Sequence, residues 1–227
     1  AGLESIRALK SRFPDFTAGA GTVLTAENAA KAVQAGADFV VSPGYQDDIA
    51  GWCLERDIPV FPGCVTPCEI QLALQKGLRT VKFFPAGVFG GLKAIKALAA
   101  PFGPAGLKFM PTGGITRVNL LEYIQCPAVA AAGGGWLCPE DEIEKGNYQA
   151  VSEAASEAVS ILLGFNPDVF SGRTGQTLKP AGPLKTNSLA RAGFYLEKYG
   201  FRQEQEENGG SVILSNPGGL KIELVQK

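Results

Sequence analysis

Lys82 is a candidate nucleophile because of the residues around it in the run TVKFFPAG (80–87). Apolar side chains surround it at Val81, Phe83 and Phe84. Burial among such groups disfavours the ammonium form, so a lysine facing into a pocket there has a lowered pKa and a nucleophilic amine. That amine can condense with a ketone, and the protonated imine withdraws electrons while an adjacent C–H or C–C bond breaks. The alternative is a structural lysine that extends its ammonium from a strand to solvent.

A second lysine, Lys108 in LKFMPTGG (107–114), competes for this role. It stands four residues before Thr112, near the amino end of its predicted strand. In parallel α/β folds the active site lies at the carboxyl ends of the strands. We therefore predict that Lys108 lies at the opposite end of the strands and rank it below Lys82 as a candidate nucleophile.

Two glycine-rich turns follow the last two predicted strands, PTGG at 111–114 and GGG at 133–135. Such turns present backbone N–H groups to a phosphate or a carboxylate. One turn of this kind is weak evidence, but two in equivalent positions predict an anion-binding end of the site.

The sequence contains no histidine. This excludes Ser-His-Asp and Cys-His catalysis and the usual histidine-containing zinc sites, because each needs an imidazole. We predict no metal and no cofactor. Five cysteines without CxxC spacing predict reduced, buried thiols in a cytoplasmic protein rather than a disulfide framework; they are Cys53, Cys64, Cys68, Cys126 and Cys138.

The elements that must position these residues alternate between short apolar runs and amphipathic stretches, which predicts parallel βα units. The predicted strands are 16–23, 37–44, 58–65, 80–87, 107–114 and 128–135. The predicted helices are 25–36, 46–57, 66–77, 90–102, 116–125 and 140–163, after a helix in progress near the start. The third of the six begins TPCE (66–69), which has capping-box spacing with proline at the first helical position.

Six βα units over residues 1–164 are two fewer than a closed (β/α)8 barrel needs. The first two strands are expected to be missing, since the chain starts at Ala1 inside a helix. Residues 165–187, rich in Gly and Pro, predict a linker, and 188–227 predict a small αβββ unit. An open barrel exposes strand edges, so we expect an oligomer or an unstable chain.

Net charge is −1 over 227 residues, which predicts no nucleic-acid partner. No apolar run approaches the ~20 residues of a membrane helix, and no signal peptide is visible. These features also predict a globular chain without a membrane partner.

Six segments form a recognisable series: GAGTVLT (19–25), AGADFVVSPG (35–44), PVFPGCVTPCE (59–69), GLRTVKFFPA (77–86), PTGGIT (111–116) and GGGWLCP (133–139). In order and at matching spacing they resemble the KDPG/KHG aldolase family, which comprises 2-dehydro-3-deoxy-phosphogluconate aldolase and 4-hydroxy-2-oxoglutarate aldolase. The resemblance implies a TIM-type (β/α)8 barrel, a homotrimer, and cleavage of a 2-keto-4-hydroxy acid, with or without a phosphate, to pyruvate and an aldehyde.

The same resemblance implies roles for individual residues. Lys82 would form the imine with pyruvate, and Thr66 would contact the pyruvyl group. The other residues that it places around the substrate are Phe84, Pro85, Thr112, Gly113, Gly114, Gly134 and Gly135.

The chain departs from the family at two points. It lacks the EVTLR-like strand that carries the family's general-base glutamate and a carboxylate-binding arginine, and proton transfer by such a base is worth ~10²- to 10⁴-fold. Glu27 and Glu69 look like first-turn helix residues rather than substitutes for that base. Gly135 replaces a serine that is frequent in the family, which removes one donor to a phosphate.

The C-terminal unit is similar to half of a glyoxalase/VOC-type module. Without histidine to hold a metal, it predicts a structural or oligomerising role. For the whole chain we predict a class I aldolase. The alternatives are a keto-acid-binding barrel that lacks its base, and a phosphate-binding barrel of other chemistry, such as an isomerase, in which Lys82 acts only electrostatically.

Overall fold

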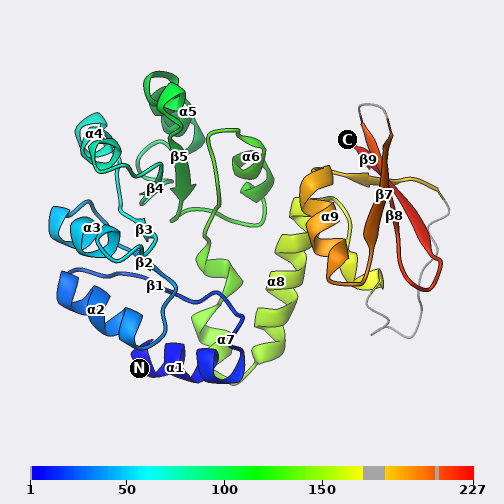
Figure 1. The fold of residues 1–227 in the computed structure, drawn as a ribbon, viewed down its shortest axis with the longest axis horizontal. Coiled ribbons are helices and arrows are strands. Elements are labelled where there is room, and N and C mark those ends of the chain that lie inside the picture. Colours follow the sequence, from blue (N-terminus) through cyan, green and yellow to red (C-terminus); the bar gives the residue numbers. More distant parts are fainter. Residues whose placement is uncertain (1, 171–181, 208–209) are drawn as a thin grey trace. The chain divides into compact units, whose positions relative to one another are not determined.

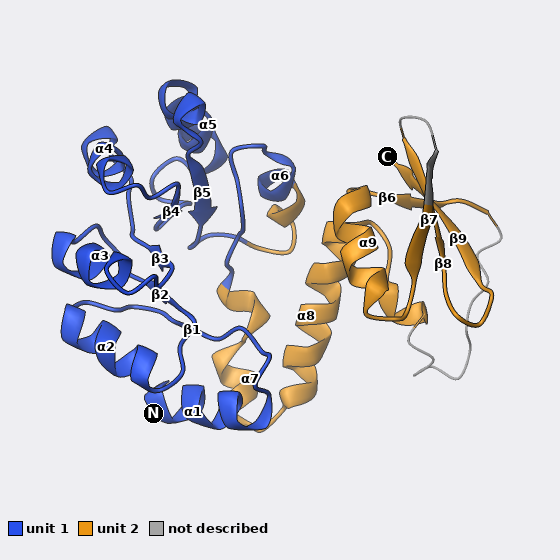
Figure 2. Ribbon diagram, in the orientation of Figure 1, with its two compact units in different colours: residues 1–115, 122–134 blue, residues 116–121, 135–227 orange. Residues whose placement is uncertain are grey.

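The structure, a computed structural model, describes residues 2–170, 182–207 and 210–227. Its contacts divide the chain into two compact units. Unit 1 comprises residues 1–115 and 122–134, and unit 2 comprises residues 116–121 and 135–227 (Figure 2).

Unit 1 alternates strands with helices along the chain (Figure 1). Its strands are β1 (Gly19–Ala20), β2 (Phe39–Val41), β3 (Val60–Phe61), β4 (Thr80–Phe83) and β5 (Lys108–Pro111). Its helices are α1 (Gly2–Arg12), α2 (Ala26–Gln34), α3 (Asp47–Leu54), α4 (Pro67–Gln75) and α5 (Gly91–Phe102), with a 3-10 turn at Gly103–Ala105. Helix α6 (Leu120–Gln125) belongs partly to each unit. Each of the first five predicted strands and helices contains the observed one.

The strands of unit 1 are parallel and follow one another in chain order. Sheet β1-β2-β3 continues into the pair β4-β5 through a parallel bridge between Gly63 and Lys82. All five carboxyl ends therefore lie at one end of unit 1, and helices α2 to α5 cover the outer side of the strands (Figure 1).

Side-chain caps fix the first residues of helices α2 and α4. The Thr25 side chain caps α2 by accepting the Asn28 N–H, and Thr66 and Glu69 form the predicted capping box of α4. Between strands and helices the core is apolar, with the Phe83 and Phe109 rings packed edge to face at 6.0 Å.

The sixth predicted strand, 128–135, is wrong as a strand. This segment makes only isolated parallel bridges, Phe109 to Val129 and Thr112 to Gly133. Alanine and glycine have low strand propensity and offer little side chain to pack, so pairing here does not extend into a regular ladder.

Unit 2 holds a 3-10 turn at Gly135–Leu137, helices α7 (Glu140–Glu144) and α8 (Tyr148–Leu163), and a 3-10 turn at Pro167–Phe170. The predicted helix 140–163 is thus two helices, separated at Gly146, whose φ is +73°. A residue in this left-handed region ends a helix, and glycine adopts it without strain.

The C-terminal part of unit 2 is a four-stranded sheet in the order β6-β9-β8-β7, with one further helix. The elements are β6 (Leu184–Thr186), α9 (Leu189–Glu197), β7 (Arg202–Glu207), β8 (Ser211–Ser215) and β9 (Lys221–Gln226). The helix and three strands expected after residue 188 are present. Their core contains Leu163, Leu196, Phe201, Ile222 and Leu224.

Part of the predicted linker 165–187 is ordered structure instead. Phe170 is buried in the core of unit 2, and β6 pairs in parallel with β9. Residues 171–181 of that linker, and residues 208–209 of the turn predicted at NGG, lie outside the described residues. The domain boundaries expected at residues 164 and 188 stay predictions.

The five cysteines are free thiols. Three of them are buried as expected, but Cys68 and Cys138 are exposed, because they lie at the first turn of α4 and after the 3-10 turn that begins at Gly135. Among the described residues, no helix is both long enough and apolar enough to cross a membrane.

Candidate active site

Lys82 occupies the third position of β4, between the buried side chains of Val81 and Phe83. Its backbone is fixed from β3 by two hydrogen bonds: the Lys82 N–H donates to the Pro62 carbonyl, and the Cys64 N–H donates to the Lys82 carbonyl, both at 2.8 Å. Because side chains alternate along a strand, Lys82 projects to the face opposite Val81 and Phe83.

The Lys82 amine lies in a partly apolar setting. Its Nζ is 4.4 Å from the centroid of the Phe84 ring, and burial lowers its pKa. Within the described part of the chain, no hydrogen bond or ion pair holds this amine. A larger fraction of the neutral, nucleophilic form is therefore present at a given pH than for a solvent-exposed lysine.

Lys108 has the opposite surroundings. It is the first residue of β5, is exposed, and pairs with Thr80 at the start of β4, so it lies at the amino end of the strands. Its Nζ donates to the Pro127 carbonyl at 2.7 Å. The structure thus confirms the position that the sequence predicts for Lys108.

The segment after Lys82 and the glycine turn after β5 are held together by their backbones. The Ala86 N–H donates to the Thr112 carbonyl at 2.8 Å, and the Gly87 N–H donates to the Gly113 carbonyl at 2.9 Å. The Thr112 N–H in turn donates to the Phe83 carbonyl at 3.0 Å. Residues 82–87 and 112–114 therefore form one continuous rim at the carboxyl ends of β4 and β5.

Glycine is required at the two central positions of this rim. Gly113 and Gly114 have φ of +86° and +81°, where other residues are strained. A Cβ on Gly114 would lie 3.1 Å from the Gly87 Cα, and one on Gly113 would lie 3.2 Å from Pro85. A side chain at either position would therefore press against the segment after Lys82.

The predicted site residue Thr66 is engaged in its own helix. Its hydroxyl donates to the Glu69 carboxylate at 2.7 Å and accepts the Glu69 N–H at 3.4 Å. Burial opposes ionisation of Glu69, but hydrogen bonds from Thr66 and Val65 outweigh it and lower the pKa of this carboxyl. Glu69 is a capping residue, and Glu27 pairs with Lys31 on the surface of α2.

Gly134 and Gly135 fall on either side of the division between the units. On the unit 1 side, the Gly133 N–H donates to the Pro111 carbonyl at 3.0 Å, which aligns this segment with the end of β5. Gly135 begins the 3-10 turn of unit 2.

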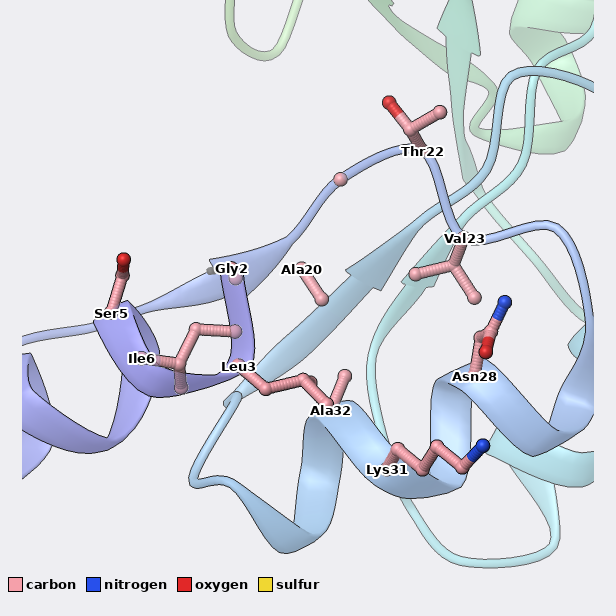
Figure 3. Close-up of a pocket in the computed structure, with 12 residues that line it drawn as sticks. Gly2, Leu3, Ser5, Ile6, Ala20, Thr22, Val23, Asn28, Lys31 and Ala32 are labelled. Carbon is pink, nitrogen blue, oxygen red and sulfur yellow. The ribbon is translucent and has the colours of Figure 1, made fainter.

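Sequence reasoning did not single out Thr22, which follows β1. Its φ is +57°, an outlier for a β-branched residue, and such strain is concentrated at functional sites. Thr22 lines a cavity of about 490 Å³ beside β1, together with Leu3 and Ile6 of α1 and Asn28 of α2 (Figure 3). Lys82 is not among the residues that line it. The glycines in GAGT (19–22) indicate a turn at this point of the sequence. No sequence pattern, however, indicates that a threonine adopts the left-handed conformation.

Two titratable side chains that sequence reasoning did not connect lie beside β3. Burial, with some repulsion from Glu69, raises the pKa of the Cys64 thiol to about 12. Burial also raises the pKa of Tyr45 to about 12, with a further contribution from its hydrogen bond to Asp47. Both groups stay protonated at neutral pH, so neither is a ready base or nucleophile.

Comparisons with known proteins all indicate the same family. The profile of the family described as KDPG and KHG aldolase matches residues 1–154. The chain is 42% identical over 159 residues to the 2-dehydro-3-deoxy-phosphogluconate aldolase of Treponema pallidum, covering 70% of this chain and 75% of that one. It is 40% identical over 157 residues to the KHG/KDPG aldolase of Escherichia coli, covering 69% and 73%.

Two solved structures extend the likeness. The KDPG aldolase of Legionella pneumophila, with pyruvate captured as a covalent carbinolamine, superposes with a TM-score of 0.64 at 37% identity, over 67% of this chain and 73% of that one. The 2-keto-3-deoxy-6-phosphogluconate aldolase of Zymomonas mobilis, with 3-phosphoglycerate, gives 0.60 at 35% identity, over 67% and 73%.

Proposed function

The chain belongs to the KDPG and KHG aldolase family, and from that premise we propose that it is a class I aldolase whose covalent residue is Lys82. One observation carries the assignment: a partly buried amine with a lowered pKa at the carboxyl end of a parallel strand, next to a glycine turn. The covalent pyruvate adduct of the Legionella relative supports the same chemistry.

The reaction follows from an imine at Lys82. The amine adds to the keto carbon of a 2-keto-4-hydroxy acid, and loss of water gives the protonated imine. A base removes the proton of the 4-hydroxyl, the C3–C4 bond breaks, and its electron pair forms an enamine while the aldehyde leaves. Protonation of carbon 3 and addition of water then release pyruvate and the free amine.

Two substrates fit this scheme and the names of the relatives. Cleavage of 2-dehydro-3-deoxy-6-phosphogluconate gives pyruvate and D-glyceraldehyde 3-phosphate. Cleavage of 4-hydroxy-2-oxoglutarate gives pyruvate and glyoxylate. The backbone of the glycine turn is suited to the anionic far end of either substrate.

We assign the surrounding residues as follows. Phe84 and Pro85 flank the imine, Thr112, Gly113, Gly114 and Gly134 hold the far end of the substrate, and Thr66 faces the pyruvyl group. The engagement of the Thr66 hydroxyl with Glu69 argues that any contact with substrate uses the second lone pair of its oxygen. Thr22, strained at the end of β1, is a further candidate for the pyruvyl end.

The general base is the open element of the proposal. Burial is the cause of the lowered Lys82 pKa, and within the described residues no ion pair joins this amine to a carboxylate. The second candidate function, a keto-acid-binding barrel with impaired proton transfer, rests on this observation. We further propose that residues 1–164 correspond to a (β/α)8-type barrel from its second helix onward. We also propose that the protein assembles as a homotrimer in the cytoplasm without a cofactor, and that residues 188–227 are a VOC-like structural extension.

The test is reduction of the imine. The protein is incubated with pyruvate and sodium borohydride and its intact mass is measured, with Lys82→Ala as the variant and Lys108→Ala as the matched control on the neighbouring strand. We expect a reduced pyruvyl adduct in the wild type and Lys108→Ala, and none in Lys82→Ala. An adduct that persists in Lys82→Ala would assign the chemistry to another lysine, and no adduct in the wild type would reject a class I mechanism.

A further inference from the structure

The Phe84 side chain contacts the Lys82 amine. The centroid of its ring lies 4.4 Å from Lys82 Nζ, within the ~6 Å range in which an aromatic face attracts a cation. Phe84 follows Lys82 by two residues at the end of β4, and side chains two residues apart along an extended chain project to the same face. The contact therefore follows directly from the spacing of the two residues.

The glycine turn after β5 helps to hold the Phe84 ring in this position. A Cβ on Gly113 would lie 3.4 Å from Cδ2 of Phe84, so the ring packs beside the Gly113 backbone. The backbone just before Phe84 is joined to the same turn, because the Thr112 N–H donates to the Phe83 carbonyl at 3.0 Å. The ring is thus placed by its neighbours on the rim of the site rather than left free in solvent.

The Lys82 nitrogen carries a positive charge at two stages of the proposed reaction. It is an ammonium in the protonated free enzyme and part of a protonated imine after condensation with the keto acid. Burial disfavours both cations. Over the described residues no ion pair or hydrogen bond joins this amine to a carboxylate, so the Phe84 ring is the group that the structure places against the charge.

An aromatic face suits a nitrogen that has to change its protonation state. It attracts a cation through its quadrupole, but it neither accepts nor donates a proton. A carboxylate in the same place would favour the ammonium strongly and keep the amine in its unreactive form. The weaker attraction of the ring leaves neutral amine available for addition, and it still favours the protonated imine that withdraws electrons from the breaking C–C bond.

We propose that Phe84 is a catalytic residue whose ring face stabilises the positive charge on the Lys82 nitrogen, in the ammonium and in the protonated imine. The proposal rests on the proposed function, because it requires an imine at Lys82. It differs from packing against a substrate, since it depends on the electrons of the ring and not on its shape. From the usual strength of such contacts, the ring shifts a protonation equilibrium of this nitrogen by about 2- to 5-fold, which corresponds to about 0.3 to 0.7 pH unit.

The first experiment tests the ammonium. Phe84 is replaced by 4-fluoro- and by 3,4,5-trifluorophenylalanine, which keep the shape of the ring and progressively weaken its attraction for a cation. Pyruvate trapping is followed against pH by intact mass, with borohydride in excess so that addition of the neutral amine limits the rate. We expect the pH of the half-maximal rate to fall at each step, by about 0.3 to 0.7 unit in the trifluoro variant, because the ammonium loses its partner. Phe84→Leu, which keeps apolar bulk without a ring face, should shift in the same direction.

The second experiment tests the imine. A low concentration of cyanoborohydride reduces the protonated imine slowly, so at subsaturating pyruvate the rate reports how much protonated imine is present. About one pH unit above the half-point, the trifluoro variant should be about 2- to 5-fold slower than wild type. The reason is that the protonated imine loses a stabilisation that the neutral free amine does not have. About one unit below the half-point the two rates should agree, because the free ammonium and the protonated imine lose the same stabilisation.

The matched control carries the same trifluorinated residue at Phe89, an exposed ring of the following loop that no cation contacts in the described part of the chain. It should keep the wild-type half-point and rates. Absence of any pyruvate adduct in the wild type would reject the proposed function, and this inference with it. A pyruvate adduct whose half-point is unchanged or raised by fluorination at Phe84 would overturn this inference alone. Slowing of imine reduction by the same factor above and below the half-point would also overturn it and assign Phe84 to packing.

Discussion

Gly63 holds the strand of Lys82 in place, and Gly63→Ala tests that arrangement. A Cβ at this position would lie 1.9 Å from the Pro43 carbonyl oxygen, so the two backbones must separate by about 1 Å before the contact reaches 3.0 Å. That shift acts directly on the bridge to Lys82 and on the hydrogen bonds through Pro62 and Cys64. Overpacking costs ~1–3 kcal/mol and two lost hydrogen bonds about 1 kcal/mol each. We therefore expect a loss of about 3–5 kcal/mol from a total of ~5–15 kcal/mol.

The assay is urea unfolding followed by circular dichroism, together with the rate of pyruvate trapping under conditions in which the variant is folded. A misplacement of about 1 Å can cost ~100-fold in rate, and we expect a decrease of that order. Gly44→Ala is the matched control, because a Cβ there meets nothing within 4 Å and the backbone is not left-handed. If Gly63→Ala unfolds and traps pyruvate as Gly44→Ala does, the proposed coupling between the Pro43 turn and Lys82 is wrong.

Three further predictions concern single groups. Because burial lowers the pKa of Lys82, the rate of pyruvate trapping should reach half of its plateau at a pH below about 10.4, the pKa of an ordinary lysine. The measurement needs a reductant that is stable over this pH range. A half-maximal rate at or above a pH of about 10.4 would contradict a lowered Lys82 pKa. The pKa of Asp38 is lowered by its hydrogen bond from the Ala18 N–H and by Lys10. The ionised Asp38 carboxylate therefore stabilises the fold fully above its pKa in the unfolded chain, about 3.9. This contribution is lost as the pH falls through the lower pKa that Asp38 has in the folded protein. The urea midpoint of wild type should therefore fall over this acidic range more than that of Asp38→Asn, and parallel curves would refute the assignment. Thr66→Ala removes the cap of α4 and should cost about 1 kcal/mol of unfolding free energy in the same titration, whereas an unchanged midpoint would show that the capping box contributes nothing.

The positions of the first five strands and helices could be predicted because each strand ends in a Gly or Pro cluster and each helix has a regular apolar pattern. The capping box at Thr66 was predicted from four letters, since it depends only on local contacts. The sixth strand failed for the opposite reason. Segment 128–135 has no alternation of apolar and polar residues that would mark a strand. Its alanines and glycines offer little side chain to pack, so its two bridges depend on the neighbouring β5 segment.

The short strand β6 shows a second limit of sequence reasoning. Its sequence, in GPLKTN, has the composition of a loop, yet Thr186 is fully buried and its hydroxyl donates to the Leu163 carbonyl at 2.7 Å. The partner that makes it a strand is β9, about 40 residues later. Three residues carry no detectable period, so this strand exists only through a tertiary contact that local pattern cannot reveal.

The two lysines of the paired strands β4 and β5 show what the structure adds for the site. Lys82 and Lys108 stand in similar apolar runs, and composition alone does not separate them. The parallel register does: Lys108 is opposite Thr80, at the amino end, whereas Lys82 is opposite Met110, two positions further toward the carboxyl end. That displacement of two residues leaves one ammonium exposed and bonded to a carbonyl, and places the other beside an aromatic ring, without an ion pair within the described residues. A partly buried amine without a counter-charge lowers the stability of the fold. In the proposed site the same burial keeps more of the Lys82 amine neutral, which is the form that reacts with a keto acid.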